Sequence, residues 1–147
     1  MQKTYPCGLW PSSITTAMVT SAQKRFDNIV IDNGEIYWSE MRPTEGGRCV
    51  IVKRAKDGKI EDVLPPPYSA RSRVHEYGGL SFAVGQGAVY FVNDKDQRIY
   101  IKDKPLTEAG TRFADLRVVG KHLIAVGEKG KITSLLLLIL AQANTRS

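Results

Sequence analysis

The residues best suited to chemistry stand in one short stretch, where His75, Glu76 and Tyr77 precede Gly78 and Gly79. An ionised carboxylate can bind an ammonium group through a charge-assisted hydrogen bond, and glycine permits close approach of the backbone. We therefore expect Glu76 to anchor a charged amine, with His75 and Tyr77 orienting it. The alternative is structural: Glu76 satisfies backbone donors or an arginine, and Tyr77 packs in the core.

No complete active site accompanies this stretch. A hydrolase nucleophile usually stands in Gly-x-Ser-x-Gly on a strand-to-helix turn, whereas residues 79–83 read G-L-S-F-A and continue as a strand. Ser81 is therefore expected to be a structural serine, and His122 to fill a surface or half-buried position. Neither a carboxylate pair nor a glycine-rich phosphate loop is recognisable. We expect no catalytic residue and no cofactor in this chain.

The excess positive charge is spread along the sequence. Twenty-one basic and fifteen acidic residues give +6; residues 1–75 hold eleven and eight, and residues 76–147 hold ten and seven, so each half contributes +3. Nucleic-acid binding requires clustered charge. The densest cluster, 53–59, is expected to be a solvated hairpin tip, with a phosphate-binding patch as the alternative. Four arginines are candidate carboxylate ligands, with ion pairing at strand edges as the alternative: Arg42, Arg48, Arg71 and Arg73.

Cys7 and Cys49 are forty-two residues apart and belong to no Cys-x-x-Cys or Cys/His cluster. Such spacing indicates neither a disulfide framework nor a zinc site, so we expect no metal and two free thiols in a reducing cytoplasm. The opening residues lack the apolar core of a secretory signal. Because the apolar run 135–140 is shorter than the ~20 residues of a membrane span, we expect no membrane partner.

The pattern of apolar residues predicts an antiparallel all-β domain. Short runs rich in Val, Ile, Tyr, Phe and Trp are bounded by turn sequences such as Asn33-Gly34, which favour two-residue hairpins. One helix is expected over residues 14–24, with Ser12 or Ser13 as its N-cap. The runs expected to form strands are 28–31, 35–38, 49–52, 80–84, 88–92, 98–101 and 122–126, followed by 132–138.

A turn followed by an apolar strand recurs along the chain, at positions 33–38, 86–91 and 120–125. Four-stranded units at spacings of ~40–45 residues are typical of β-propeller blades. We expect about two and a half blades, whereas propellers close with roughly 4–8. The chain is therefore either an open arc or the front of something larger, and exposed blade edges would favour a homo-oligomer.

Several stretches, in order, resemble the N-terminal part of bacterial prolyl oligopeptidase family enzymes, of the type called acylaminoacyl peptidase or dipeptidyl aminopeptidase. Residues 73–79 match R-V-H-E-Y-G-G, and residues 36–48 resemble V-Y-W-x-E-x-R-P-x-E-G-G-R. The other matching stretches are 8–15 (G-x-W-x-S-P-I-T), 94–100 (x-x-D-Q-R-L-Y) and 113–117 (R-Y-A-D-x-R). The resemblance covers residues 8–128.

The resemblance implies an N-terminal propeller that covers the active site and filters peptides, followed by an α/β-hydrolase domain with a Ser-Asp-His triad. This chain would correspond to the first blades only, acting with a hydrolase domain in cis or in trans and inactive alone. Glu76 would then anchor the free α-amino group of a peptide substrate. The alternative function is a non-catalytic binding or assembly module that uses exposed blade edges. We expect no nucleic-acid partner.

The sequence departs from the family pattern at both ends. Ser13 replaces a usual proline, and after Glu128 the similarity fades into a leucine-rich run that lacks alternation. A premature stop, a frameshift or a truncation would produce such an end. We therefore divide the chain into a capping segment (1–25), a partial propeller (26–128) and an atypical apolar tail (129–147) that is aggregation-prone unless covered.

Overall fold

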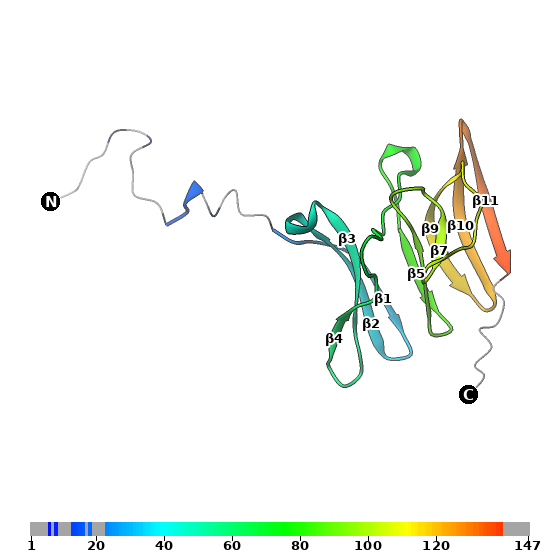
Figure 1. Ribbon diagram of the computed structural model, residues 1–147, viewed down its shortest axis with the longest axis horizontal. Helices are drawn as coiled ribbons and strands as arrows, with labels where there is room; N and C mark the ends of the chain where they lie inside the picture. Colours follow the sequence, from blue (N-terminus) through cyan, green and yellow to red (C-terminus); the bar gives the residue numbers. More distant parts are fainter. Residues whose placement is uncertain (1–5, 7, 9–12, 17, 19–22, 140–147) are drawn as a thin grey trace.

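The computed structural model describes residues 6, 8, 13–16, 18 and 23–139, in which eleven strands form three antiparallel sheets (Figure 1). The first sheet has the order β1 (Arg25–Asp32), β2 (Glu35–Arg42), β3 (Arg48–Arg54), β4 (Ile60–Asp62). The second has the order β5 (Phe82–Gly85), β6 (Ala88–Val92), β7 (Ile99–Ile101), β8 (Lys104–Pro105). The third comprises β9 (Arg112–Val119), β10 (His122–Lys129) and β11 (Ile132–Ile139) in the order β11-β10-β9. Two 3₁₀ turns accompany them, η1 (Pro43–Glu45) and η2 (Val74–Glu76).

The first two sheets begin with a tight hairpin whose turn residues accept positive φ. Asn33 and Gly34 have φ of 49° and 77°, and Gln86 and Gly87 have 56° and 73°. Two successive positive φ angles define the type I′ turn, whose twist matches that of the flanking strands. The turn chemistry seen in the sequence therefore sets the register of β1 with β2 and of β5 with β6.

The three sheets lie side by side, with the first strand of each at the centre of the arrangement (Figure 1). β5 contacts both β1 and β9, and a groove is lined by residues of these three strands. Successive sheets of three or four antiparallel strands that pack face to face are the blades of a β-propeller. The chain is thus an all-β, incomplete β-propeller, which confirms the predicted fold class, and its third sheet has three strands in the described residues.

Two apolar cores fill the spaces between the sheets. The first lies between sheets one and two and contains an aromatic cluster, in which the ring centroids of Tyr68, Phe91 and Tyr100 lie 5.6–5.7 Å apart. The second lies between sheets two and three, around Ile99 and Leu123, which are both fully buried. Burial of each such side chain stabilises the fold by roughly 1.5–3 kcal/mol.

The expected helix over residues 14–24 is only partly present in the described residues. Thr16 and Met18 are helical, but Gln23 and Lys24 are not, so the predicted end at Lys24 is wrong. The amide of Met18 donates to Thr15 Oγ1 at 3.1 Å, the geometry of an N-cap. Thr15 makes this capping bond, whereas Ser12, one of the two expected caps, lies outside the described residues.

The leucine-rich run forms the expected strand, β11, which pairs with β10 along its whole length, from Lys129↔Ile132 to His122↔Ile139. Leu136 and Leu138 pack against the second core, whereas Leu135 and Leu137 are exposed. The two faces of this strand therefore differ in burial, although its sequence does not alternate.

The basic cluster 53–59 spans the end of β3 and the turn before β4, as expected for a hairpin tip. Lys53 pairs with Glu35 and Glu61, and Lys59 also pairs with Glu61. No helix in the described part of the chain is long and apolar enough to cross a membrane.

Candidate functional site

The candidate site is the connection between the first and second sheets, which contains η2. Gln97, in the turn after β6, fixes the start of this connection: its Oε1 accepts from the Arg73 amide at 2.7 Å, and its Nε2 donates to the Arg71 carbonyl at 3.1 Å. The D-Q-R stretch noted in the sequence therefore has a structural role. It positions the backbone that leads into His75 and Glu76.

The backbone at the site adopts a conformation that side chains rarely accept. His75 and Glu76 have φ of 51° and 63°, in the left-handed region. Such residues cost of order 1–3 kcal/mol each, and they persist only where surrounding contacts fix them. Here the His75 amide donates to Glu128 Oε2 at 3.1 Å. The turn is therefore tied to the third sheet.

Glu76 is paired with an arginine of the third sheet. Arg112 binds Glu76 Oε1, and the same guanidinium donates to the Arg73 carbonyl at 3.0 Å. The hydrogen bond and charge of Arg112 lower the pKa of Glu76, so the carboxyl is ionised at neutral pH. The Glu76 side chain is 76% exposed, and Oε2 has no bond to any described residue. Glu76 therefore has the arginine partner that the structural alternative predicts, and its second carboxylate oxygen, Oε2, still faces solvent.

His75 and Tyr77 contact neither each other nor Glu76 by any hydrogen bond between described residues. His75 Nδ1 lies 3.0 Å from Glu128 Oε1, and its Nε2 lies 3.4 Å from Thr133 Oγ1. Tyr77 is 97% exposed, so the alternative that places it in the core is wrong. The three predicted residues are adjacent, but Arg112 is the residue that orients Glu76.

Sequence reasoning missed two members of this site, Arg112 and Glu128. Arg112 lies 36 residues from Glu76, and Glu128 lies 53 residues from His75. One signal was available for Arg112, because it directly precedes the stretch 113–117 and occupies the first position of the R-Y-A-D-x-R pattern. No comparable pattern marks Glu128.

A polar cleft of about 470 Å³ lies beside the site, between the first sheet and the connection. Arg25 and Arg71 line it, and neither has an ion pair among the described residues. Asp115 closes one side, where its Oδ1 accepts from the Leu80 amide at 3.1 Å. Tyr77 lies at the cleft and is almost fully exposed. The cleft therefore presents to solvent two cationic groups, the carboxylates of Asp27 and Asp115, and one aromatic ring.

The cleft has no activated nucleophile among the described residues that line it. Ser81 is buried and donates through Oγ to the Ala70 carbonyl at 3.2 Å, as expected for a structural serine. Burial raises the pKa of the Cys49 thiol, which keeps it protonated. Cys7 lies outside the described residues. The described part of the chain contains no cluster of metal-ligating side chains.

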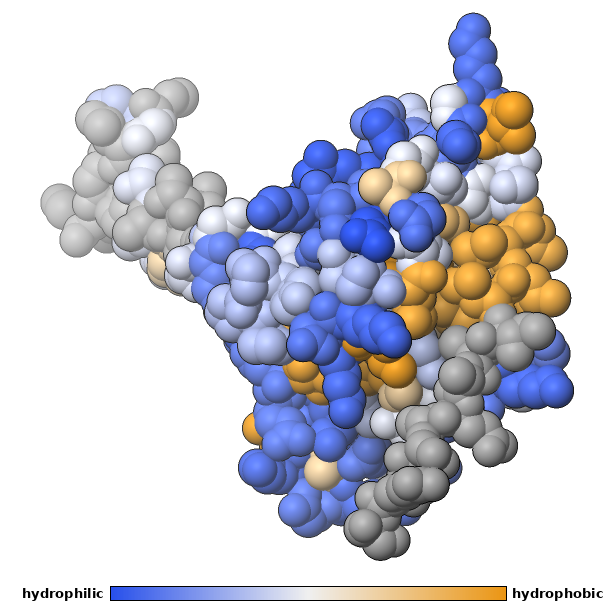
Figure 2. Space-filling model, turned by 45° about the vertical axis from the view of Figure 1, so that its right-hand side comes forward, coloured by the Kyte–Doolittle hydropathy of each residue, from blue (hydrophilic) through white to orange (hydrophobic). Residues whose placement is uncertain are grey.

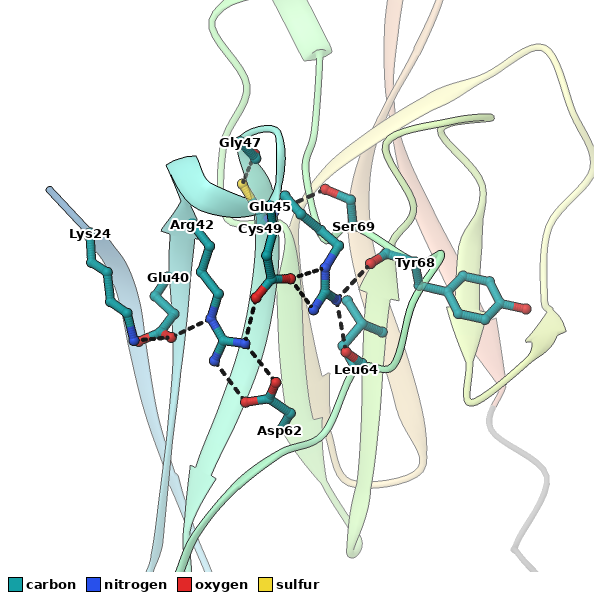
Figure 3. Close-up of polar contacts among 11 residues, drawn as sticks. Lys24, Glu40, Arg42, Glu45, Gly47, Cys49, Asp62, Leu64, Tyr68 and Ser69 are labelled. Carbon is teal, nitrogen blue, oxygen red and sulfur yellow. Dashed lines mark hydrogen bonds and ion pairs between the residues drawn. The ribbon is translucent and has the colours of Figure 1, made fainter. Parts of the chain in front are cut away.

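The stretch that resembles R-P-x-E-G-G-R has a structural role in the first sheet (Figure 3). Arg42 binds Glu40 at 2.6 Å and makes a bidentate pair with Asp62 at 2.6 and 2.7 Å. Glu45 receives both Arg42 at 3.1 Å and Arg48 at 2.6 Å. Of the four candidate carboxylate ligands, Arg42, Arg48 and Arg73 are ion-paired, and only Arg71 has no ion pair among the described residues.

Solved structures with a similar architecture include enzymes. A puromycin-hydrolyzing peptidase of Mycobacterium tuberculosis matches 96% of this chain with a TM-score of 0.82 and 32% sequence identity. Two structures of puromycin hydrolase match with TM-scores of 0.74 and 0.75, at 28% and 29% identity over 92% and 91% of the chain. The likeness is to part of a peptidase. The chain spans 24% of the length of each of these proteins.

No protein-family model and no curated protein matches the chain. The likeness to the solved peptidases exceeds a shared fold, because it combines 32% identity with nearly complete coverage of this chain. This likeness agrees with the sequence stretches between residues 8 and 128, which resemble the prolyl oligopeptidase family and occur in the same order. The puromycin-hydrolyzing peptidases are therefore similar to this chain in both sequence and architecture.

Proposed function

We propose that the chain is the N-terminal part of the propeller of a serine peptidase of the prolyl oligopeptidase family. In this role it covers and filters access to an α/β-hydrolase domain that supplies the catalytic triad in cis or in trans. The observation that carries the proposal is the likeness of 96% of this chain to one quarter of a puromycin-hydrolyzing peptidase. The buried, hydrogen-bonded Ser81 supports a non-catalytic role for this part.

The proposal extends to the substrate and the compartment. The exposed Glu76 carboxylate supports binding of a peptide's free α-amino group, as in an enzyme of acylaminoacyl peptidase or dipeptidyl aminopeptidase type that cleaves near the N-terminus. His75 and Tyr77 contribute through the position of the turn and through the exposed ring beside it. We place the protein in the cytoplasm because Cys7 and Cys49 show no pairing pattern.

The chain alone is expected to be inactive. We expect no hydrolysis of puromycin or of aminoacyl and acylaminoacyl p-nitroanilides that a serine-directed inhibitor removes, because a triad and its strained nucleophile turn are required. An immunoblot of source cells should show a product several times heavier than the 16.3 kDa of this chain. Inhibitor-sensitive turnover by the purified chain would refute the inactivity. A native product of 16.3 kDa would refute a single-chain peptidase and leave only a hydrolase domain supplied in trans.

Glu76→Gln is expected to remove a preference for unblocked peptides. A charge-assisted hydrogen bond to an ammonium group contributes about 1.5–3 kcal/mol, so the chain should bind a free tripeptide about 10- to 100-fold more tightly than its N-acetylated form. Isothermal titration of both peptides with both proteins measures this ratio. The ratio should approach one in the variant.

Glu108→Gln is the matched control, because Glu108 is exposed in the turn before β9 and lies outside the candidate site. This variant should keep the preference of the unmodified chain. If Glu76→Gln and Glu108→Gln discriminate between the two peptides equally, Glu76 does not bind the amine. Its role would then be limited to the ion pair with Arg112.

A second candidate function, a non-catalytic assembly module, is favoured by one observation. Large apolar side chains are exposed on both terminal sheets, including Ile29, Ile31, Leu135 and Leu137. Exposed apolar surfaces of this kind mark interaction sites. Multi-angle light scattering tests the module directly, since a monomer at tens of micromolar would count against it.

A further inference from the structure

Arg71, in the connection between the first two sheets, has a side chain that makes no ion pair and no hydrogen bond with any described residue. Arg73, two residues further on, instead binds Asp94 at 2.8 Å. The backbone of Arg71 is fixed from both sides, because its amide donates to the Val92 carbonyl at 3.0 Å and its carbonyl accepts from Gln97 Nε2 at 3.1 Å. Arg71 therefore offers an unpaired guanidinium from a fixed position, and such preorganisation favours binding.

The Arg71 side chain points into the polar cleft of about 470 Å³. The neighbouring residues, Ala70 and Ser72, are buried, whereas Arg71 is exposed between them. Arg25 reaches the same cleft from β1, and its register partner on β2, Met41, also lines it. Arg25 likewise has no ion pair with a described residue. Two unpaired guanidinium groups, from two different elements, therefore share one cleft.

The carboxylates at the cleft have other partners and do not pair with these arginines. Asp27 Oδ1 accepts from the Asn28 amide at 2.9 Å, and Asp115 Oδ1 accepts from the Leu80 amide at 3.1 Å. Glu40 belongs to the ion-pair network of the first sheet. The cleft as a whole therefore has little net charge. It can select an anion through directed hydrogen bonds, but not through a broad positive potential of the kind that attracts nucleic acids.

The remaining groups at the cleft suit a ligand of peptide size. Gly79 lines the cleft, and its amide has no hydrogen-bond partner among the described residues, so it is available to donate to a ligand oxygen. The Tyr77 ring is almost fully exposed there. The cleft is separate from the hydrophobic area over the third sheet in Figure 2, whose exposed leucines do not line it. Its volume lies within the ~300–1,000 Å³ of small-ligand sites.

We propose that this cleft is a carboxylate-binding subsite for peptides, in which the Arg71 guanidinium binds the carboxylate and Arg25 adds a second positive charge. The planar fork of a guanidinium matches a carboxylate through two parallel hydrogen bonds, which a neutral amide cannot accept in the same way. The carboxylate is the C-terminal group of a short peptide or an acidic side chain, since the two share one chemistry. The inference rests on the proposed function in that the ligand is a peptide, and it adds a preference for peptides that carry a carboxylate at this subsite.

The test uses N-acetylated peptides, so that the proposed amine site at Glu76 does not contribute. The probes are N-acetyl-trialanine with a free carboxylate, the C-terminal amide of the same peptide, and N-acetyl-Ala-Ala-Asp amide, whose only carboxylate is in the side chain. Titrations followed by ¹H–¹⁵N NMR spectra give the dissociation constants and locate the site. The unmodified chain should bind a carboxylate peptide about tenfold more tightly than the neutral amide. The Gly79 amide resonance should shift on binding.

Arg71→Gln should abolish this preference, and Arg71→Lys, which keeps the charge but lacks the planar fork, should keep part of it. The matched control is Arg54→Gln, because Arg54 is exposed, has no ion pair with a described residue and does not line the cleft. This control should retain the full preference. Arg71→Gln removes no side-chain contact of the kinds described above, so its urea midpoint should match that of the unmodified chain. Arg25→Gln, which should reduce the preference severalfold, provides a second test from another strand.

Three results would overturn the subsite. They are equal affinity for the neutral amide and both carboxylate peptides, an equal loss of preference in Arg54→Gln, and no binding of any probe to the unmodified chain at millimolar concentration. A preference for trialanine alone assigns the C-terminal carboxylate, and a preference for the aspartyl amide alone assigns an acidic side chain; both support the subsite. The peptidase proposal fails through different results, because the immunoblot and the activity assay do not depend on Arg71. The amine proposal fails only through the comparison of Glu76→Gln with its own control.

Discussion

Replacing Arg42 with alanine is expected to lower the free energy of unfolding by about 3 kcal/mol at neutral pH, since the buried carboxylate of Glu40 then keeps only the exposed Lys24 as a cationic partner. Glu40 is 4% exposed, and its partners are Arg42 at 2.6 Å, Lys24 at 3.1 Å and Trp38 Nε1 at 3.4 Å. Arg42 also forms the bidentate pair with Asp62 (Figure 3). Urea denaturation followed by tryptophan fluorescence measures the loss.

The pH dependence distinguishes this electrostatic effect from a simple loss of packing. Burial alone would raise the pKa of Glu40, but the hydrogen bonds from Arg42, Lys24 and Trp38 keep it below the ordinary value of 4.5. The hydrogen bond from Arg42 likewise lowers the pKa of Asp62. A carboxyl whose pKa is lowered by folding contributes stability above its unfolded pKa, and this contribution is lost as the pH falls through the folded pKa.

The Arg42→Ala variant lacks the hydrogen bond that most strongly opposes the effect of burial on Glu40, so the pKa of Glu40 should rise. Protonation of Glu40 should then remove the buried charge. The difference in stability between the two proteins should therefore shrink as the pH is lowered from about 7 towards about 4. Arg54→Ala is the control, because Arg54 is exposed at the end of β3 and has no ion pair among the described residues; it should change stability by less than about 0.5 kcal/mol. A difference that does not vary with pH would contradict the electrostatic account.

The fold could be predicted from the sequence because its signals are local. The turn at Asn33-Gly34 and the alternating strands around it act within a few residues, and each repeats in the next blade. The positive φ angles at Gly46 and Gly47 explain why two glycines separate Glu45 from Arg48 in the family-like stretch. The role of that stretch was less predictable, because Asp62, the second carboxylate bound to Arg42, lies twenty residues away.

The candidate site was only partly predictable because its partners come from different sheets. His75 and Glu76 were found from their types and from the glycines that follow, but Arg112 and Glu128 reach them only when the third sheet packs beside the second. The faces of β11 are decided in the same way. Leu135 and Leu136 are neighbouring residues of the same type. Leu136 is half-buried only because it packs against the second core, whereas Leu135 is exposed. Packing partners, rather than propensity, determine these features.

Gly85→Ala should destabilise the chain by about 3 kcal/mol, because the added methyl group has no room at the interface between sheets two and three. A Cβ at Gly85 would lie 2.6 Å from Val118 Cγ1 and 2.7 Å from Val118 Cβ. Val118 is β-branched, so rotation about χ1 cannot move both contacts away. The sheets would have to separate, with loss of contacts in the second core. Thermal and urea unfolding measure the change.

Gly127→Ala makes the same substitution at another glycine in a strand and should be tolerated. A Cβ there would meet its nearest neighbours, on Phe113 and Thr111, at 3.4 Å, which is ordinary van der Waals contact. The exchange variant Gly85→Val/Val118→Gly moves the side chain from β9 to β5 and should recover most of the loss caused by Gly85→Ala, minus the roughly 0.5–1 kcal/mol cost of glycine in a strand. If Gly85→Ala is as stable as Gly127→Ala, the close packing of β5 on β9 does not hold sheets two and three together. Their arrangement must then depend on the second core alone.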